Sequence, residues 1–380
     1  MRVCIIYDCL YPNTIGGAER WYRNLAERLA RDGNTVTYLT LRQWDRGDPP
    51  QVAGVNVIPV GPRMGLYVHG RRRIGPPIVF GLGVLKHLAL HGRRYDVVHT
   101  ASFPYFSLLA SGLLRRRKRY RLVVDWFEVW SREYWREYLG PLGGLGFAIQ
   151  RLCVRFRQEA FCFSQVHERR LRDEGAAWPV TVLRGLFEGD LEAPEPTPAQ
   201  PMIVFAGRHI PEKQVTAIVP ALLAAREHVP ELRCEIYGDG PDRPEVLRQI
   251  ERHGLEDICD APGFVEQEQI EHALRTGVCL VLPSRREGYG LVVVETLARG
   301  TPVVVVAGPD NAAVEFIEEG VNGFVAPSVS PEDLSEAIIR VYRAGSALRE
   351  STVAWFAKNG HALSLESSLA AVAASYRGTS

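Results

Sequence analysis

The chain reads Glu287-Gly288-Tyr289-Gly290-Leu291-Val292-Val293-Val294-Glu295 at its most informative point, with a carboxylate at each end of a short glycine-containing stretch. The apolar run Val278–Leu282 precedes this stretch, and the pattern from Leu291 to Ala298 predicts a helix that ends before Gly300. The turn therefore joins the end of a strand to the start of a helix. Free amides and the positive end of the helix dipole favour an anion such as phosphate there.

The two carboxylates indicate what flanks that phosphate. Gly288 and Gly290 allow a ligand to approach the backbone closely. Because phosphate repels carboxylates, we expect Glu287 and Glu295 to accept hydrogen bonds from hydroxyl groups on either side of it. Two polyols that flank a phosphate describe a nucleotide sugar. The alternative is that Glu287 only complements the helix dipole and that Glu295 is a solvated helix residue.

Short β-rich runs alternate with helical patterns along the chain, which predicts an α/β fold. Strands that are apolar on both faces and separated by helices form parallel sheets covered on both sides. The predicted strands are Val3–Tyr7, Thr35–Thr40, Val55–Val60, Asp96–His99, Leu122–Asp125, Phe161–Ser164, Met202–Ala206, Arg233–Tyr237, Val278–Leu282 and Pro302–Val306. We therefore predict two Rossmann-like, doubly wound domains that face each other across a cleft.

The proline-rich residues 188–201 divide the two series of strands, because proline blocks helix and sheet and stiffens a connection. The predicted organisation is a first domain over 1–187, the linker, a second domain over 202–360, and a C-terminal segment 361–380. We expect that segment to be helical over Ser364–Tyr376 and to pack back on the first domain. Closure of the domains about the linker is expected to exclude water from the cleft.

Candidate ligand-binding residues cluster where the predicted strands end, which is where open parallel sheets bind ligands. Gly16-Gly17 follows the first strand, Gly207-Arg208 follows Met202–Ala206, and Gly238-Asp239-Gly240 follows Arg233–Tyr237. Arg208 and Lys213 are spaced to bracket a diphosphate, the guanidinium by paired hydrogen bonds and the ammonium as a point charge. The alternative is a pair of surface charges near Glu212.

Composition narrows the class of protein. The chain has 380 residues, 46% hydrophobic and 23% charged, and a net charge of +1, which gives no global attraction to nucleic acid. Its cysteines lie scattered in apolar runs and are predicted to be buried and reduced, as in a cytoplasmic protein. No classical leader or membrane-spanning run is recognised, so we expect a cytoplasmic protein.

Two basic runs, Arg71–Arg73 and Arg115–Arg119, interrupt this charge balance. The second follows an apolar stretch of a predicted helix and is typical of a solvated helix end. The alternative is that it anchors the helix at an anionic membrane surface, which would make the protein peripheral to the inner membrane face.

A series of motifs runs along nearly the whole chain. They are Gly16-Gly17-Ala18-Glu19, Arg208…Lys213, Gly238-Asp239-Gly240-Pro241, Gly263-Phe264-Val265, Glu287…Glu295, and Gly308-Pro309-Asp310-Asn311…Glu315…Gly320-Val321-Asn322-Gly323. Their order and spacing resemble those of the GT-B glycosyltransferases of the glycosyltransferase family 4 type, a group of retaining enzymes.

The resemblance implies roles for the second domain in binding a donor. Arg208 and Lys213 would neutralise the diphosphate, and Glu287 would orient the transferred sugar. Glu295 would bind the ribose hydroxyls, and Phe264 and Val265 would lie near the base. The amides of Gly288, Tyr289, Gly290 and Leu291 would hold sugar and phosphate, and Gly16 and Gly17 match the family's N-terminal glycine loop.

The first domain departs from the family at one place. Many relatives carry a histidine shortly after the strand that corresponds to Leu122–Asp125, where this chain has Phe127. His99, Asp125, Trp126 and Glu128 are the candidates for contacting the acceptor or the donor sugar instead. Alternatively, His99 is a core-edge histidine, and the aromatic residues that follow Asp125 form part of the core.

The function implied is retaining transfer of a sugar from a UDP- or GDP-sugar to an acceptor bound by the first domain. The leaving phosphate would help to remove the acceptor proton in a front-face substitution. No cofactor is expected beyond the nucleotide-sugar co-substrate, and no metal, since no Asp-x-Asp motif occurs. The alternatives are another nucleotide-sugar chemistry, such as an epimerase or pseudo-glycosyltransferase, and a binding protein without turnover.

Overall fold

The computed structural model describes the chain apart from residues 15, 46, 48, 69–70, 193, 195–196 and 378–380, and the side chains of 67–72. The predicted linker 188–201, the segment 361–380 and the basic run Arg71–Arg73 therefore lie partly outside the described residues. The chain divides into two compact units. Unit 1 comprises Met1–Leu183 with Ser368–Ser380, and unit 2 comprises Arg184–Ser367.

Unit 1 is built on a seven-stranded sheet of order β3-β2-β1-β6-β7-β8-β9, in which every pair is parallel. Its strands are β1 (Arg2–Ile6), β2 (Thr35–Leu41), β3 (Val55–Gly61), β6 (Val97–Ala101), β7 (Arg121–Trp126), β8 (Glu159–Cys162) and β9 (Val180–Val182). A small antiparallel pair, β4 (Tyr67–Val68) and β5 (Arg71–Arg72), stands apart. The helices are α1 (Gly17–Arg31), α2 (Gly75–His91), α3 (Phe106–Lys118), α4 (Arg132–Leu139), α5 (Gly143–Val154) and α6 (Gln165–Asp173).

Unit 2 has a six-stranded parallel sheet of order β12-β11-β10-β13-β15-β17. Its strands are β10 (Gln200–Ala206), β11 (Arg233–Tyr237), β12 (Cys259–Gly263), β13 (Gly277–Leu282), β15 (Val303–Val306) and β17 (Gly323–Ala326). A second parallel pair consists of β14 (Arg286–Glu287) and β16 (Asp310–Asn311). The helices are α7 (Ile218–Arg226), α8 (Arg243–Arg252), α9 (Gln267–Thr276), α10 (Leu291–Leu297) and α11 (Pro331–Leu363). The prediction of an α/β fold with two Rossmann-like domains is confirmed.

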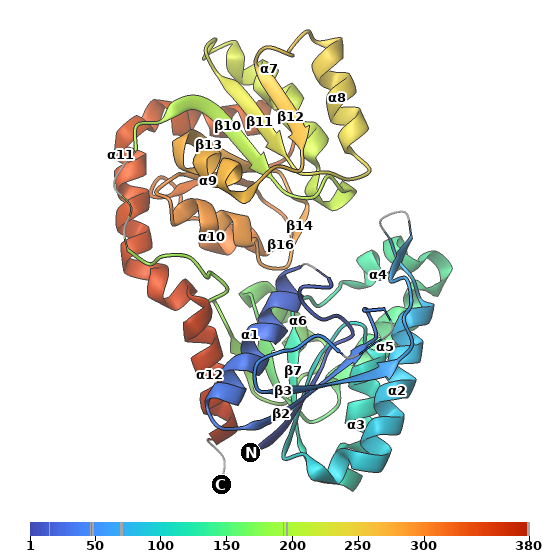
Figure 1. The fold of residues 1–380 in the computed structure, drawn as a ribbon. Helices are drawn as coiled ribbons and strands as arrows, with labels where there is room; N and C mark the ends of the chain where they lie inside the picture. Colours follow the sequence, from blue (N-terminus) through green and yellow to red (C-terminus); the bar gives the residue numbers. More distant parts are fainter. Residues whose placement is uncertain are drawn as a thin grey trace. The chain divides into compact units, whose positions relative to one another are not determined.

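The chain returns to unit 1 through α12 (Leu365–Arg377). Arg121 of β7 donates hydrogen bonds to the carbonyl oxygens of Tyr376 (3.0 Å) and Ser375 (3.1 Å) near the end of this helix. Figure 1 shows α12 in dark red beside the blue and green strands of unit 1. The last turns of the chain are thus held on a strand of the first sheet.

The cysteines and the lengths of the helices bear on two expectations about the whole chain. Every cysteine is buried and carries a free thiol, which confirms their predicted burial. Within the part of the chain that is described, no helix has both the length and the apolar character needed to cross a bilayer.

Candidate active site

The site in unit 2 begins where the strand order of its sheet reverses. β10 is the central strand: β11 pairs with it on one side and β13 on the other. Ligands of open parallel sheets bind beyond the carboxyl ends of strands at such a switch point. Arg208 lies on the loop after β10, and Glu287 lies in β14, which follows β13, so the two predicted residues come from the two chain segments that flank this point.

The structure joins Lys213 and Glu287 across 74 positions of sequence in an ion pair between Lys213 Nζ and Glu287 Oε1. The Glu287 side chain is 9% exposed and that of Lys213 is 18% exposed. A carboxylate withdrawn from water in this way needs a cation or hydrogen-bond donors to offset the loss of hydration. Lys213 supplies that cation to Glu287.

Ser284 and Asn311 hold the Glu287 turn in place, although no role was predicted for either residue from the sequence. The Ser284 hydroxyl donates to Glu287 Oε1 over 3.0 Å. Asn311 is fully buried, and its amide donates to the carbonyl oxygens of Ser284 (3.0 Å) and Val306 (2.8 Å). Asn311 lies within the quoted Gly308–Asn311 motif, and a buried amide that ties two strand ends together explains why an asparagine suits that place.

The remaining loops at this edge are tied together by backbone contacts. The amide of Arg285 donates to the carbonyl of Glu212 over 2.9 Å, which connects the Lys213 turn to the Glu287 turn. Gly238 has a φ of +111°, and a Cβ at this residue would lie 1.9 Å from the carbonyl oxygen of Gly207. Only glycine therefore allows these loops to approach, and Arg208 is left exposed between β10 and the Lys213 turn.

His209 follows Arg208 and differs from it in exposure. Its side chain is fully buried, with its ring 5.7 Å from that of Phe205. Burial lowers the pKa of His209. A neutral ring beneath this loop leaves the positive charge of the site on Arg208 and Lys213.

The turn Glu287–Gly290 leads into α10. Gly290 has a φ of +92°, and a Cβ there would lie 2.8 Å from the Cβ of Ala313. Leu291, at the start of the helix, and Glu295, one turn later, are both half-buried. Gly288 is also half-buried.

The side chain of Tyr289 has a structural role that the sequence did not indicate. Only 8% of the residue is exposed. Its hydroxyl donates to the carbonyl of Arg184 (2.5 Å) and accepts from the amide of Leu186 (3.3 Å). The tyrosine thus fastens the first residues of unit 2 to the site, and only its backbone remains for the predicted donor contact.

Phe264 and Val265 follow β12 at the same edge of the sheet. Phe264 is 79% exposed, the largest exposed fraction among the exposed large hydrophobic residues of the described chain. An aromatic ring held in solvent at a strand end is a surface on which a flat base can stack. Val265 beside it is half-buried.

In unit 1, the glycines predicted to bind the donor start α1. Gly16 is the N-cap in extended conformation, and Gly17 is the first helical residue. A Cβ on Gly16 would lie 2.3 Å from Glu19 Oε2, whereas a Cβ on Gly17 would meet no atom within 4 Å. Gly17 therefore faces open space at the carboxyl end of the sheet.

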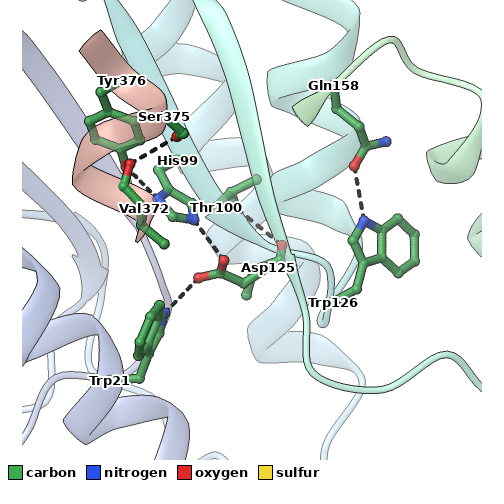
Figure 2. A network of polar contacts seen from close by, with 10 residues as sticks. Trp21, His99, Thr100, Asp125, Trp126, Gln158, Val372, Ser375 and Tyr376 are labelled. Atoms are coloured by element: carbon green, nitrogen blue, oxygen red, sulfur yellow. Dashed lines mark hydrogen bonds and ion pairs between the residues drawn. The ribbon is translucent and has the colours of Figure 1, made fainter. Parts of the chain in front are cut away.

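His99 and Asp125, two of the residues predicted to contact the acceptor or the donor sugar, are enclosed in unit 1. Both are fully buried, and Figure 2 shows them in one polar network. His99 Nδ1 lies 2.5 Å from the Tyr376 hydroxyl, and Nε2 lies 2.9 Å from Asp125 Oδ1. Trp21 Nε1 donates to the other Asp125 oxygen over 2.7 Å. This network attaches α12 to the sheet, and the partners of His99 in it are the side chains of Tyr376 and Asp125.

Trp126 and Glu128 are also engaged within unit 1. Trp126 is fully buried, and its indole donates to Gln158 Oε1 (2.9 Å). Glu128 is half-buried and accepts from Trp130 Nε1 (2.7 Å). Phe127 stacks on Phe163 with ring centroids 4.7 Å apart, so a hydrocarbon stack stands where the family resemblance predicts a histidine.

No group of three or more His, Cys, Asp and Glu side chains that could hold a metal ion occurs among the residues that the structure describes. Positive charge at the unit 2 site comes from Arg208 and Lys213. A diphosphate bound there would be held by these two side chains.

Two family models match consecutive parts of the chain. The Glycosyltransferase Family 4 model matches residues 15–185, and the model "Glycosyl transferases group 1" matches residues 190–354. The first match lies in unit 1 except for residues 184 and 185, and the second lies in unit 2.

Curated proteins also resemble part of the chain. An alpha-D-kanosaminyltransferase of Streptomyces kanamyceticus is 31% identical over 142 residues, which is 37% of this chain and 36% of that protein. Such matches span between 15% and 36% of the first relatives' own lengths.

Solved structures resemble the whole fold. Sucrose-phosphate synthase of Thermosynechococcus elongatus superimposes with a TM-score of 0.78 at 18% identity, over 99% of this chain and 98% of that one. Anabaena Alr3699/HepE in complex with UDP-glucose gives a TM-score of 0.72 at 17% identity over the full length of both chains. The chain belongs to the GT-B glycosyltransferases of the glycosyltransferase family 4, group 1 type.

Proposed function

We propose that this protein transfers a sugar from a UDP-sugar, or less favourably a GDP-sugar, to an acceptor bound by unit 1. The observation that carries the proposal is the buried Lys213–Glu287 pair at the switch point of the unit 2 sheet. It puts a cation and a hydrogen-bond acceptor side by side, as a sugar joined to a diphosphate requires. The similarity to HepE, whose structure contains UDP-glucose, supports uridine as the base.

The proposed chemistry follows from where charge develops. The bond between the anomeric carbon and the phosphate oxygen breaks, and the acceptor oxygen bonds to that carbon on the same face. The acceptor proton passes to the leaving phosphate. Negative charge on the diphosphate grows during this step, and Arg208 and Lys213 stabilise it because they are already in place. Glu287 accepts a hydrogen bond from the sugar and holds it in orientation.

The presence of Phe127 is the reason to keep a second candidate reaction within the same family. A phenylalanine cannot accept or donate a proton or hydrogen-bond the sugar as histidine does. Another nucleotide-sugar chemistry, such as epimerisation or formation of a non-glycosidic bond, is therefore kept as the alternative. The identity and anomeric configuration of the product distinguish it from retaining transfer.

Thermal unfolding with UDP, GDP, ADP and dTDP tests the proposal, repeated on Arg208→Ala and Glu295→Ala. UDP at about 100 times its Kd should stabilise the protein by about 2.7 kcal/mol, and both variants should lose the effect. Incubation with α-linked UDP-sugars and acceptor extracts, in EDTA, should give an α-linked product by NMR. A protein that none of the nucleotides stabilises would overturn the donor site, and a β-linked product would overturn retention.

A further inference from the structure

A cavity of about 150 Å³ in unit 1 takes no part in the donor chemistry. Phe103, Pro104 and Tyr105 form one side of it, and Trp135, Tyr138 and Ile149 form another. Arg73 is the one charged residue among those that line it in the described chain, and the others are apolar or aromatic. An apolar lining of this kind suits a hydrocarbon group.

Exposed apolar side chains surround the opening of the cavity. Ile74 is 57% exposed, Leu142 is 55% exposed and Leu145 is 60% exposed, and all three line the cavity. Large apolar residues exposed next to one another indicate a binding surface more often than isolated ones do. The cavity is thus open to a molecule that arrives from solvent.

A fully buried amide holds the aromatic wall in place. Gln150 Oε1 accepts hydrogen bonds from the Tyr105 hydroxyl (2.8 Å), Trp135 Nε1 (3.0 Å) and the Trp130 amide (3.1 Å). Its Nε2 donates to the Trp130 carbonyl over 2.8 Å. Because these bonds fix the rings before any ligand arrives, binding costs little side-chain entropy.

Two backbone features keep the space open. Tyr105 has a φ of +46°, a conformation that is uncommon and strained for a non-glycine residue. At Gly146 of α5, a Cβ would lie 2.2 Å from Trp135 Cε3, so glycine lets the indole lie flat on the helix. Both features shape the wall rather than fill the cavity.

The cavity lies on the functional edge of the unit 1 sheet. Phe103–Tyr105 follow β6, and the segment that leads to Trp135 follows β7, so both walls come from carboxyl ends of strands. β6 pairs with β1 on one side and β7 on the other, and the strand order reverses between β1 and β6. Open parallel sheets bind ligands at this edge and next to this point.

We propose that this cavity binds an apolar group carried by the acceptor, about the size of one aromatic ring or a short hydrocarbon branch. Apolar cavities of about this volume in other proteins accept benzene. With Arg73 as the neighbouring charge, the rest of the acceptor is neutral or anionic. That the occupant belongs to the acceptor rests on the proposed function; that it is apolar rests on the cavity alone.

Binding of fluorobenzene to the full chain, followed by ¹⁹F NMR, tests the proposal. We expect saturable binding that weakens at least tenfold in Ile149→Trp, which fills the cavity, and in Leu145→Gln, which makes its opening polar. Leu152→Trp is the matched control: Leu152 lies on the same helix, is 48% exposed and does not line the cavity. This control should bind fluorobenzene as the unaltered protein does.

The outcomes separate the two proposals. Fluorobenzene that fails to saturate, or that binds both Ile149→Trp and Leu145→Gln normally, would overturn the apolar site. Leu145→Gln alters an exposed residue, so its result does not depend on how the core tolerates tryptophan. Stabilisation by UDP should be the same in all three variants. If UDP does not stabilise the unaltered protein, the proposed donor site is wrong, but the conclusion about the apolar cavity is unaffected.

Discussion

At the scale of single residues, Lys213 is the clearest test of the unit 2 site. Replacing it by methionine leaves the buried Glu287 carboxylate without its cation. Removing one partner of a buried pair destabilises a protein by about 3 kcal/mol. We also expect kcat for sugar transfer to fall by about 10²-fold or more, since one stabilising charge on the leaving diphosphate is lost. Urea unfolding and initial rates measure the two effects.

The double variant Lys213→Met with Glu287→Gln separates stability from catalysis. A neutral amide no longer needs the cation, so most of the lost stability should return while kcat stays low. If the second substitution recovers no stability, the two side chains are not coupled as the structure shows.

Burial also distinguishes the predicted site residues from one another. His99 was predicted to close a strand but lies in the middle of β6, and Asp125 lies near the end of β7. A sequence pattern cannot tell a polar group that faces a ligand from one that faces another element. The partner that buries them, Tyr376, is 277 positions from His99. Glu287 shows the converse, because glycines and a strand–helix junction mark its place locally. Its partner Lys213 was predicted from the spacing to Arg208, but the ion pair itself was not.

At the scale of elements, the strands were predictable where they are apolar throughout. β13 is fully buried along its length and was predicted over nearly its whole range. β12, at the edge of the unit 2 sheet, alternates buried and exposed residues and contains Pro262, so its sequence does not resemble a central strand. β9 has only three residues and gives a pattern too short to recognise.

The junction of α5 and α6 should give unit 1 a pH-dependent stability. Burial raises the pKa of Glu174 to about 7, and its carboxylate accepts from Gln150 Nε2 over 2.6 Å. Arg151 and Arg170 act to lower this pKa, and Asp173 acts to raise it. An unfolded glutamate titrates near 4.3, so the folded state holds the proton more tightly. Stability is then highest below that pH and falls as pH rises through about 7.

Glu174→Gln should remove this dependence while keeping an oxygen for Gln150. At pH 8 we expect the variant to be more stable than the unaltered protein by about 1–2 kcal/mol, allowing for solvent screening of a partly exposed carboxyl. At pH 4 the two should be alike. Glu168→Gln, on the surface of α6, is the control and should leave the pH profile unchanged. Denaturation curves from pH 4 to 8 would contradict the prediction if the two profiles stay parallel.

The attachment of α12 to unit 1 depends on Tyr376. Its hydroxyl faces His99 in a fully buried network, and Tyr376→Phe leaves Nδ1 of that ring without this partner. We expect a loss of about 2 kcal/mol in the stability of unit 1. Tyr342→Phe removes a hydroxyl that bonds Glu231 at the surface of unit 2, and it should change little. Equal effects of the two substitutions would contradict a special role for the His99 network.

At the scale of the whole molecule, each unit has its own sheet and its own covering helices, as Figure 1 shows. Domains with separate cores can unfold as separate cooperative transitions. We therefore expect calorimetry to show two transitions, of which Tyr376→Phe lowers only that of unit 1. UDP at about 100 times its Kd should raise the other transition, by a stabilisation of about 2.7 kcal/mol.

The transition that UDP raises shows which unit binds the donor, and this result does not depend on the acceptor. If UDP raises the transition that Tyr376→Phe lowers, the main donor contacts lie in unit 1 around Gly16 and Gly17, and the Lys213–Glu287 pair is structural. If UDP raises the other transition, Arg208→Ala should abolish the shift, because its guanidinium is exposed at the switch point of the unit 2 sheet. A single transition would mean that the units unfold together, and the Arg208→Ala comparison would then decide the location alone.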